Sequence, residues 1–305
     1  MSEQTANRFA DLPARDRESF AKIMRMPHEA RALEMMRLPM TASDVIIATF
    51  PKAGTTWTQQ ICHGLRSNGD MSFKEVSWVV PWIERGHMFD IDTTIAQQFT
   101  PRVFKTHLEY AHVNKGARYL HIIRDPKDVL VSFYNFISAG LIDAQCVALE
   151  TVAEVWLLAD QLAEGRDVDA GFSPHLYNYW RHLLDWWAAR DQAPVLSLAY
   201  EHMRQDLAGH VARIANFMGV HADAATLERA TQQASFEFMA AHKEQFSDQI
   251  PGTPITLRKV VQGRVGAHRG LIGEALEARI DAAWRHYITP VLGFESYDAL
   301  LASMA

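Results

Sequence analysis

One stretch near the N-terminus constrains the fold more than any other. Residues 45–48 (Val-Ile-Ile-Ala) form a short apolar run that is typical of a buried strand, and residues 56–62 have a helical pattern. Between them lies a turn that contains Gly54. A strand, a glycine turn and a helix start bring free backbone N–H groups and the positive end of the helix dipole to one point. The stretch therefore predicts a phosphate cradle, to which Lys52 adds a charge and Thr55 adds a hydroxyl.

This turn does not follow the Walker pattern. In that motif the lysine follows the second glycine, whereas Lys52 precedes Gly54, the only glycine of the stretch. An ordinary strand-to-helix turn explains the stretch equally well when it is taken alone. The motifs further along the chain have to decide between these two interpretations.

Composition narrows the class of protein. The chain has 305 residues, of which 48% are hydrophobic, and this is enough for one large α/β domain. A net charge of −6 argues against a general nucleic-acid binder. Cys62 and Cys146 lie far apart, so a disulfide framework is not expected. With no long apolar run and no signal-peptide pattern, we expect a cytoplasmic protein without a membrane span. The 14 histidines show no metal-ligand spacing, so no metal is expected.

Strand and helix patterns alternate along most of the chain. Further strands are predicted at 102–107, 119–123 and 194–200. Helices are predicted at 126–140, 144–162, from 173 through 187, at 206–218 and at 271–288. This alternation predicts an α/β fold, a P-loop-like parallel sheet flanked by helices on both faces, in a single domain. Residues 1–43 are predicted to form an N-terminal helical arm packed on the main domain, 44–305.

Polar clusters follow three of the predicted strands, at 51–56, 105–107 and 124–132. Ligands of parallel sheets bind at the carboxyl ends of the strands, so these clusters are expected to share one site. His107 would suit a general base near neutral pH, although a hydrogen-bonded histidine at a strand end is the commoner case. Arg124 can grip a phosphate with two hydrogen bonds, and Ser132 can donate to the same group. By itself, the basic pair Arg258-Lys259 is more typical of a solvated face.

Four motifs, in their order and spacing, resemble the cytosolic sulfotransferase family. They are Pro51-Lys52-x-Gly54-Thr55-Thr56-Trp57, Lys105-Thr106-His107-Leu108, Arg124-Asp125-Pro126-Lys127-Asp128-Val129 with Ser132, and Arg258-Lys259. The resemblance extends to Trp186-Trp187, Tyr200-Glu201-x-Met203 and Ser235-Phe236-x-x-Met239, and it covers about residues 40–290.

The resemblance implies a modified P-loop fold and the donor 3′-phosphoadenosine 5′-phosphosulfate (PAPS), with PAP as the product. It assigns the 5′-phosphosulfate to the loop backbone around Gly54 and to Lys52, Thr55 and Thr56. It assigns the 3′-phosphate to Arg124, Ser132, Arg258 and Lys259. Trp57 and Phe236 would sandwich the adenine, with Tyr200 beside it. Catalysis would fall to His107 as general base, together with Lys52, Lys105 and Ser132.

The expected reaction is sulfuryl transfer to a hydroxyl of a small, largely apolar acceptor, such as a phenol or an alcohol. Scattered apolar residues in 66–100 are candidates for lining its pocket. Val260 and Val265 stand where the family usually has Gly and Trp, so a non-catalytic PAP or PAPS binder remains an alternative. A P-loop kinase fits less well, because the Walker lysine position is missing. The usual dimer motif is not recognisable around 269–271, so a homodimer would need another contact.

Overall fold

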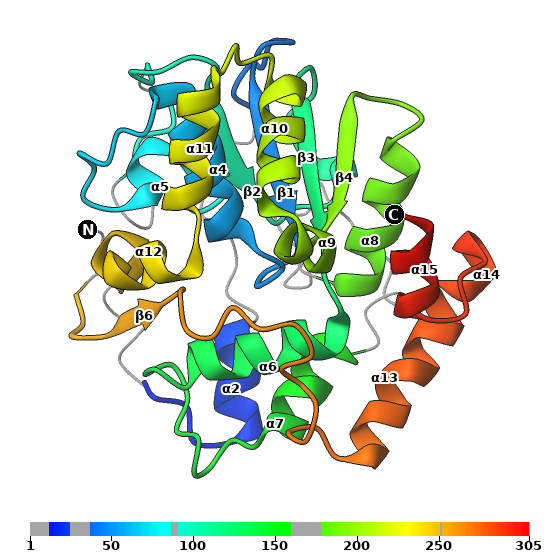
Figure 1. Ribbon diagram of the computed structural model, residues 1–305. Helices are drawn as coiled ribbons and strands as arrows, with labels where there is room; N and C mark the ends of the chain where they lie inside the picture. Colours follow the sequence, from blue (N-terminus) through cyan, green and yellow to red (C-terminus); the bar gives the residue numbers. More distant parts are fainter. Residues whose placement is uncertain are drawn as a thin grey trace.

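The computed structural model describes residues 12–24, 37–86, 91–94, 96–159, 178–250 and 252–304. Its centre is a parallel sheet of four strands in the order β2-β1-β3-β4 (Figure 1). The strands are β1 (Val45–Thr49), β2 (Val103–Thr106), β3 (Arg118–Ile123) and β4 (Val195–Ala199). All four predicted strands are confirmed, each to within a residue or so of its expected ends.

The central strand β1 explains why its sequence is a continuous apolar run. All five of its residues are buried, and it pairs with β2 on one side and β3 on the other. A parallel strand covered on both faces has no polar side. Its alternate side chains therefore enter two different cores, Val45 and Ile47 on one face and Ile46 and Ala48 on the other.

Helices cover both faces of the sheet, as the alternating pattern predicted. One face carries α4 (Thr55–Ser67), α10 (Leu207–Met218) and α11 (Ala224–Gln233), which lie in front of the strands in Figure 1. The opposite face is covered by α8 (Tyr179–Ala189), whose Trp186 shares a buried cluster with Ile46 of β1.

A second group of helices lies beyond the carboxyl ends of the strands, in the lower part and at the right of Figure 1. It contains α2 (Arg17–Met24), α6 (Pro126–Ile137), α7 (Leu149–Val152), the π-helical turn η3 (Ala153–Leu157), α13 (Glu274–Tyr287), α14 (Thr289–Leu292) and α15 (Tyr297–Ser303). Phe133 stacks on Trp156 in its core, with ring centroids 3.7 Å apart. The remaining elements are α5 (Val76–Val79), η2 (Tyr110–His112), α9 (Tyr200–Gln205), α12 (Phe236–Ala241), η5 (Lys243–Phe246), β5 (Ser247–Gln249) and β6 (Thr256–Arg258).

Local signals set several helix ends correctly. The Asp125 side chain accepts a hydrogen bond from the backbone N–H of Lys127, and Pro126 opens α6. Gly219 ends α10 with φ of 73°. Three predicted helices differ from the structure. The helix predicted at 126–140 ends at Ile137. The stretch 144–162 holds only α7 and the turn η3 among its described residues, and α13 begins three residues later than expected, after Gly273. The predicted start at 173 lies outside the described residues.

The described part of the N-terminal arm is attached to the rest of the molecule. The backbone of Ala14 pairs with Leu141 and Asp143 at 2.9 and 2.8 Å, and Phe20 of α2 is buried in the core around α6. The boundary at residue 43 stays a prediction. In the described part of the chain, no helix combines the length and the apolar character needed to cross a membrane.

Candidate active site

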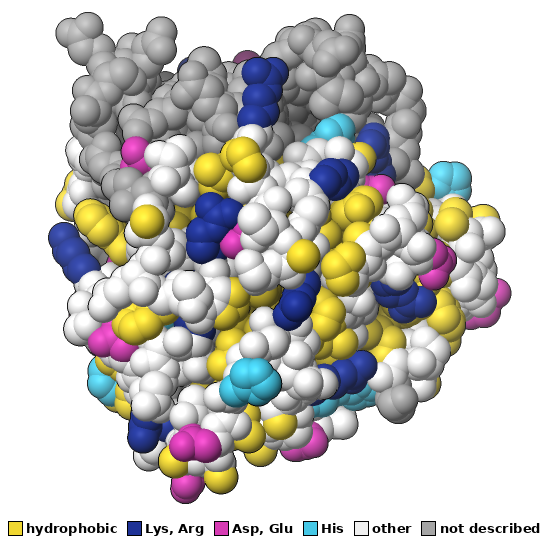
Figure 2. All heavy atoms as spheres, turned by 90° about the horizontal axis from the view of Figure 1, so that it is seen from above, with side chains coloured by type: hydrophobic (Ala, Val, Ile, Leu, Met, Phe, Trp, Pro, Cys, Tyr) yellow, Lys and Arg dark blue, Asp and Glu magenta, His cyan; other side chains and the backbone are white. Residues whose placement is uncertain are grey.

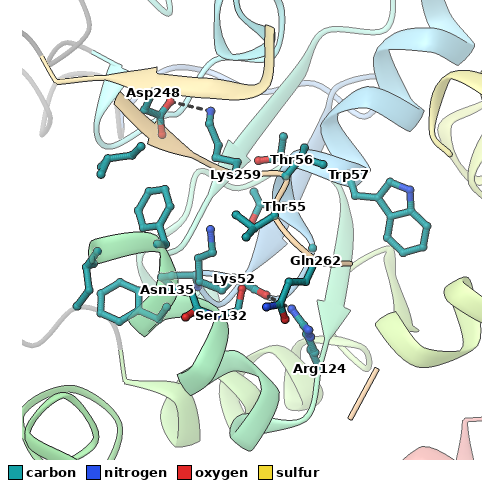
Figure 3. Close-up of a pocket in the computed structure, with 18 of the residues that line it drawn as sticks. Lys52, Thr55, Thr56, Trp57, Arg124, Ser132, Asn135, Asp248, Lys259 and Gln262 are labelled. Carbon is teal, nitrogen blue, oxygen red and sulfur yellow. Dashed lines mark hydrogen bonds and ion pairs between the residues drawn. The ribbon is translucent and has the colours of Figure 1, made fainter. Parts of the chain in front are cut away.

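A cavity of about 340 Å³ lies where the carboxyl ends of the strands face α6 (Figure 3). Every predicted site residue except Arg258 lines it. The lining members of that set are Lys52, Gly54, Thr55, Thr56, Trp57, Lys105, His107, Arg124, Ser132, Tyr200, Phe236 and Lys259. On the outer face in Figure 2, basic side chains are dispersed among acidic and apolar ones. Basic side chains also line the cavity, among them Lys52, Lys105, Arg124 and Lys259, and an anionic ligand would bind there.

The turn after β1 takes an unusual backbone path. Lys52 and Gly54 both adopt positive φ, 71° and 106°, and α4 starts at Thr55 directly behind them. A Cβ atom on Gly54 would lie 3.0 Å from the ring of Tyr200, so glycine is required both by conformation and by space. The first N–H groups of α4 thus face the cavity. This is the arrangement expected for a phosphate cradle.

Two lysines enter the cavity beside this turn. The Lys52 ammonium lies 3.9 Å from the ring centroid of Phe136, and burial, reinforced by nearby Lys259, lowers its pKa to about 7. Lys105 is buried, donates to the Ser77 hydroxyl at 3.2 Å and lies over the ring of Trp82. Burial, again reinforced by Lys259, lowers the pKa of Lys105 to about 8. Both charges are poorly solvated and therefore favour a bound anion.

His107 is held in one tautomer. Its Nδ1 lies 2.7 Å from the carbonyl oxygen of Thr49, which can only accept, so Nδ1 carries the proton and Nε2 keeps the lone pair. Burial, then the charge of Lys105, lowers the pKa of His107 well below 6.5, which keeps the imidazole neutral. The His107 backbone N–H also donates to buried Glu84 at 2.8 Å. Glu84 was not anticipated from the sequence, because a single glutamate carries no local signal of such a role.

Arg124 connects two loops. Its Nη1 donates to the Lys52 carbonyl at 3.0 Å and its Nη2 donates to the Arg264 carbonyl at 3.1 Å. The guanidinium carbon lies 4.3 Å from the ring centroid of Tyr200. Among the described residues, the buried Nε of Arg124 has no hydrogen-bond partner.

The aromatic residues predicted to hold adenine form one group. Trp57 donates from its indole to the Ala234 carbonyl at 2.7 Å, and its ring meets Tyr200 edge-on at 5.2 Å. Phe236 opens α12 and lies against Gly263, where a Cβ atom would come within 2.7 Å of the ring. These contacts fix the rings around a space where a planar base could stack.

The basic pair Arg258-Lys259 is arranged differently from the expectation. Side chains alternate along β6, so Leu257 and Lys259 line the cavity while exposed Arg258 does not. The Lys259 ammonium pairs with Asp248 at 2.7 Å and with Glu75 at 2.8 Å. Burial alone would lower the pKa of Lys259, but these two carboxylates outweigh it and raise the pKa. Neither acid was anticipated from the sequence, since Glu75 comes from a distant segment and Asp248 faces Lys259 only through the pairing of β5 with β6.

The apolar end of the cavity comes mainly from two helices. Phe20, Ile23 and Met24 of α2 face Phe136 and Ile137 of α6 across it. Among the described residues of the predicted segment 66–100, only Trp82 and Arg85 line the cavity. The arm and α6 contribute apolar surface there instead, which periodicity alone did not indicate.

The glycine turn and the lysine–histidine cluster thus meet in one cavity at the carboxyl ends of the parallel strands. The family model of the sulfotransferase domain matches residues 42–287, so the chain belongs to this family of transferases. The described residues hold no cluster of three or more His, Cys, Asp or Glu side chains that could bind a metal.

Known proteins support the same relationship. Sulfotransferase 1C2 of Oryctolagus cuniculus is 26% identical over 207 residues, which are 64% of this chain and 65%, just under two thirds, of that protein. Sulfotransferase 1B1 of Canis lupus familiaris is 26% identical over 269 residues, 84% of this chain and 81% of that protein. The fold resembles retinol dehydratase in a complex with androsterone and inactive cofactor PAP. The TM-score is 0.61 at 17% identity, with 96% of each chain covered.

Proposed function

We propose that this protein transfers a sulfuryl group from PAPS to a hydroxyl of a small, largely apolar acceptor. One observation carries the proposal: Lys52, Lys105 and His107 meet in a cavity with a phosphate cradle at one end and apolar helices at the other. The family and the PAP complex of a protein with the same fold support the choice of donor. Free cysteines at positions 62 and 146 suit the expected cytoplasmic location.

The chain's own groups would hold the donor at several points. The N–H groups at the start of α4, with Thr55 and Thr56, would bind the phosphosulfate. Lys52 would neutralise the charge that grows on the bridging oxygen as the sulfur–oxygen bond breaks. Trp57 and Phe236 would hold the adenine between them.

His107 would act on the acceptor. As the acceptor oxygen attacks sulfur in line with the leaving group, its proton passes to Nε2 of His107 and PAP departs. Lys105 would stabilise the oxygens of the transferring group. The Thr49 carbonyl supports this role, because it fixes the tautomer and would stabilise the imidazolium that forms.

The test is PAPS-dependent sulfate transfer to a panel of phenols and alcohols. Replacing His107 with Ala should lower kcat by roughly 10²–10⁴-fold, the usual contribution of a general base. PAP affinity, measured by calorimetry, should stay nearly unchanged. Exposed His221 offers the control, since His221→Ala removes an imidazole far from the chemistry. Equal loss of turnover and PAP affinity in His107→Ala would contradict the base role.

The same assay separates the two alternatives. Transfer that persists in EDTA fits this proposal, whereas ATP turnover that requires Mg²⁺ would point to a kinase. Tight PAP binding without transfer to any acceptor of the panel would point to a non-catalytic binder.

A further inference from the structure

The chain leaves the sheet directly after β2, at His107. β2 is an edge strand of the four-stranded sheet, so within that sheet only β1 pairs with it. The Thr49 carbonyl at the end of β1 binds the His107 imidazole, and Glu84 accepts the His107 backbone N–H. Neither of these contacts involves the loop that follows, residues 108–113. The path of this loop has to be set by another part of the molecule.

Helix α8 binds the first two residues of the loop. The buried Trp186 indole donates to the Leu108 carbonyl at 2.9 Å. The Arg181 guanidinium donates to the Glu109 carboxylate at 3.0 Å, and the two side chains are 30% and 1% exposed. Water therefore screens this ion pair less than it would screen a pair on the open surface. The ion pair restrains the chain only two residues after His107.

A second charged side chain of α8 binds the loop further along. Asp185 accepts the backbone N–H of Ala111 at 2.7 Å. Asp185 and Arg181 lie four residues apart in α8, so they project from the same face of the helix. One rigid element thus holds the loop through a side chain and through the backbone, and both hydrogen bonds are charge-assisted.

The position of this loop bears directly on the proposed base. The Thr49 carbonyl accepts from Nδ1 of His107 at 2.7 Å, and this contact keeps the lone pair on Nε2. If the loop moved away from α8, the contact would lengthen and the proton could shift to Nε2, which then cannot take a proton from the acceptor. A displacement of about 1 Å can lower a rate by about 10²-fold. Arg181 and Asp185 do not line the cavity, so they can act on catalysis only indirectly.

We infer that Arg181 and Asp185 are positioning residues for catalysis: together they hold the loop 108–113 against α8, which keeps His107 in the tautomer that accepts a proton at Nε2. This inference rests on the proposed function, since it assumes that His107 takes the proton of the acceptor hydroxyl. Strand register brings His107 to Thr49, and the two charged side chains of α8 keep it there.

The first measurement separates turnover from nucleotide binding. Arg181→Met should lower kcat about tenfold and Asp185→Ala about threefold, while the PAP dissociation constant, measured by calorimetry, stays within about twofold of the wild-type value. Arg181→Lys keeps a charged donor and should recover most of the rate. Arg190→Met and Asp191→Ala are the matched controls, and both should match the wild type. They remove the same kinds of side chain from exposed positions at the end of α8.

The second measurement reads the tautomer of His107 without turnover. In protein with isotope-labelled histidine, long-range proton–nitrogen NMR spectra distinguish Nδ1–H from Nε2–H, and the signal that is missing in His107→Ala identifies this residue. The wild type should show Nδ1–H alone, whereas Arg181→Met and Asp185→Ala should show a mixture of the two tautomers. A merely structural role of the two side chains would lower stability and leave this signal unchanged.

Two results would overturn the inference: variants whose kcat and His107 signal match the wild type, or an equal loss of kcat and PAP affinity. Asp185→Ala is decisive even where Arg181→Met unfolds, because it does not take a partner from the buried Glu109 carboxylate. If the wild-type protein transfers sulfate to no acceptor of the panel, the proposed function itself fails. Transfer by the wild type and, at the same rate, by the Arg181 and Asp185 variants overturns only this inference.

Discussion

The two ends of the proposed nucleotide cavity are built in different ways. At the end proposed for the phosphosulfate, Lys52 and His107 follow β1 and β2 while Lys105 lies in β2, and the parallel register pairs Ile47 with Lys105 and Ala48 with Thr106. The next step along both strands brings His107 to Thr49, where the 2.7 Å contact forms. At the other end, Arg124 meets a loop about 140 residues further along the chain. Strand register thus positions one end, while only tertiary contacts position the other.

The largest effect is expected at the register-positioned end. Lys105→Met should lower kcat by roughly 10²–10³-fold, because it removes a preorganised charge next to the transferring group. Since PAP lacks that group, PAP affinity should change little. Initial rates and PAP titrations measure the two effects separately, and exposed Lys243→Met provides the control. A large loss of PAP affinity would place Lys105 on the nucleotide instead.

The pH dependence of PAP binding should also separate the two ends. The pKa of Lys52 is lowered to about 7 in the free protein, so Lys52 loses its charge as pH rises through that value. A bound phosphate stabilises the charged form and raises this pKa, so binding takes up a proton. We expect PAP affinity to fall about tenfold between pH 6.5 and pH 8.5.

Calorimetry in buffers of different ionisation enthalpy measures this proton uptake. Lys52→Met should remove most of the pH dependence, whereas the control Lys243→Met at an exposed position should retain it. A pH profile that is unaltered in Lys52→Met would assign the titration to another group.

The same difference explains what the sequence could predict. The apolar run of β1, the glycine turn and the Asp125-Pro126 helix start are local signals, and the strands, the cradle and α6 followed from them. To place Lys105 and His107 at the same site, only one further rule was needed, that the carboxyl ends of parallel strands lie at one edge of the sheet.

Tertiary packing determined the features that could not be predicted from the sequence. One partner of Lys259, Glu75, lies far from it in the chain, and the other, Asp248, reaches it through the pairing of β5 with β6. A dibasic pair looks identical whether its lysine faces a ligand or an internal carboxylate. The apolar lining from α2 was missed for a similar reason, since a helical pattern does not tell which surface the helix will cover.

The smallest effect on PAP binding is expected from replacing Gly263 in the loop, and Gly270 provides a matched control. Gly263 and Gly270 have φ of 60° and 76°, so Ala at either position carries a similar backbone strain of about 1 kcal/mol. Their surroundings differ: a Cβ on Gly263 would lie 2.7 Å from the Phe236 ring, whereas no described atom lies within 4 Å of one on Gly270. Gly263→Ala should therefore push the loop off the ring and weaken PAP binding about fivefold, which is about 1 kcal/mol. Gly270→Ala should leave PAP binding unchanged while lowering thermal stability by a similar amount. Equal PAP affinity in the two variants would mean that the loop does not need its contact with Phe236, and the loop end would then be more loosely built than its hydrogen bonds indicate.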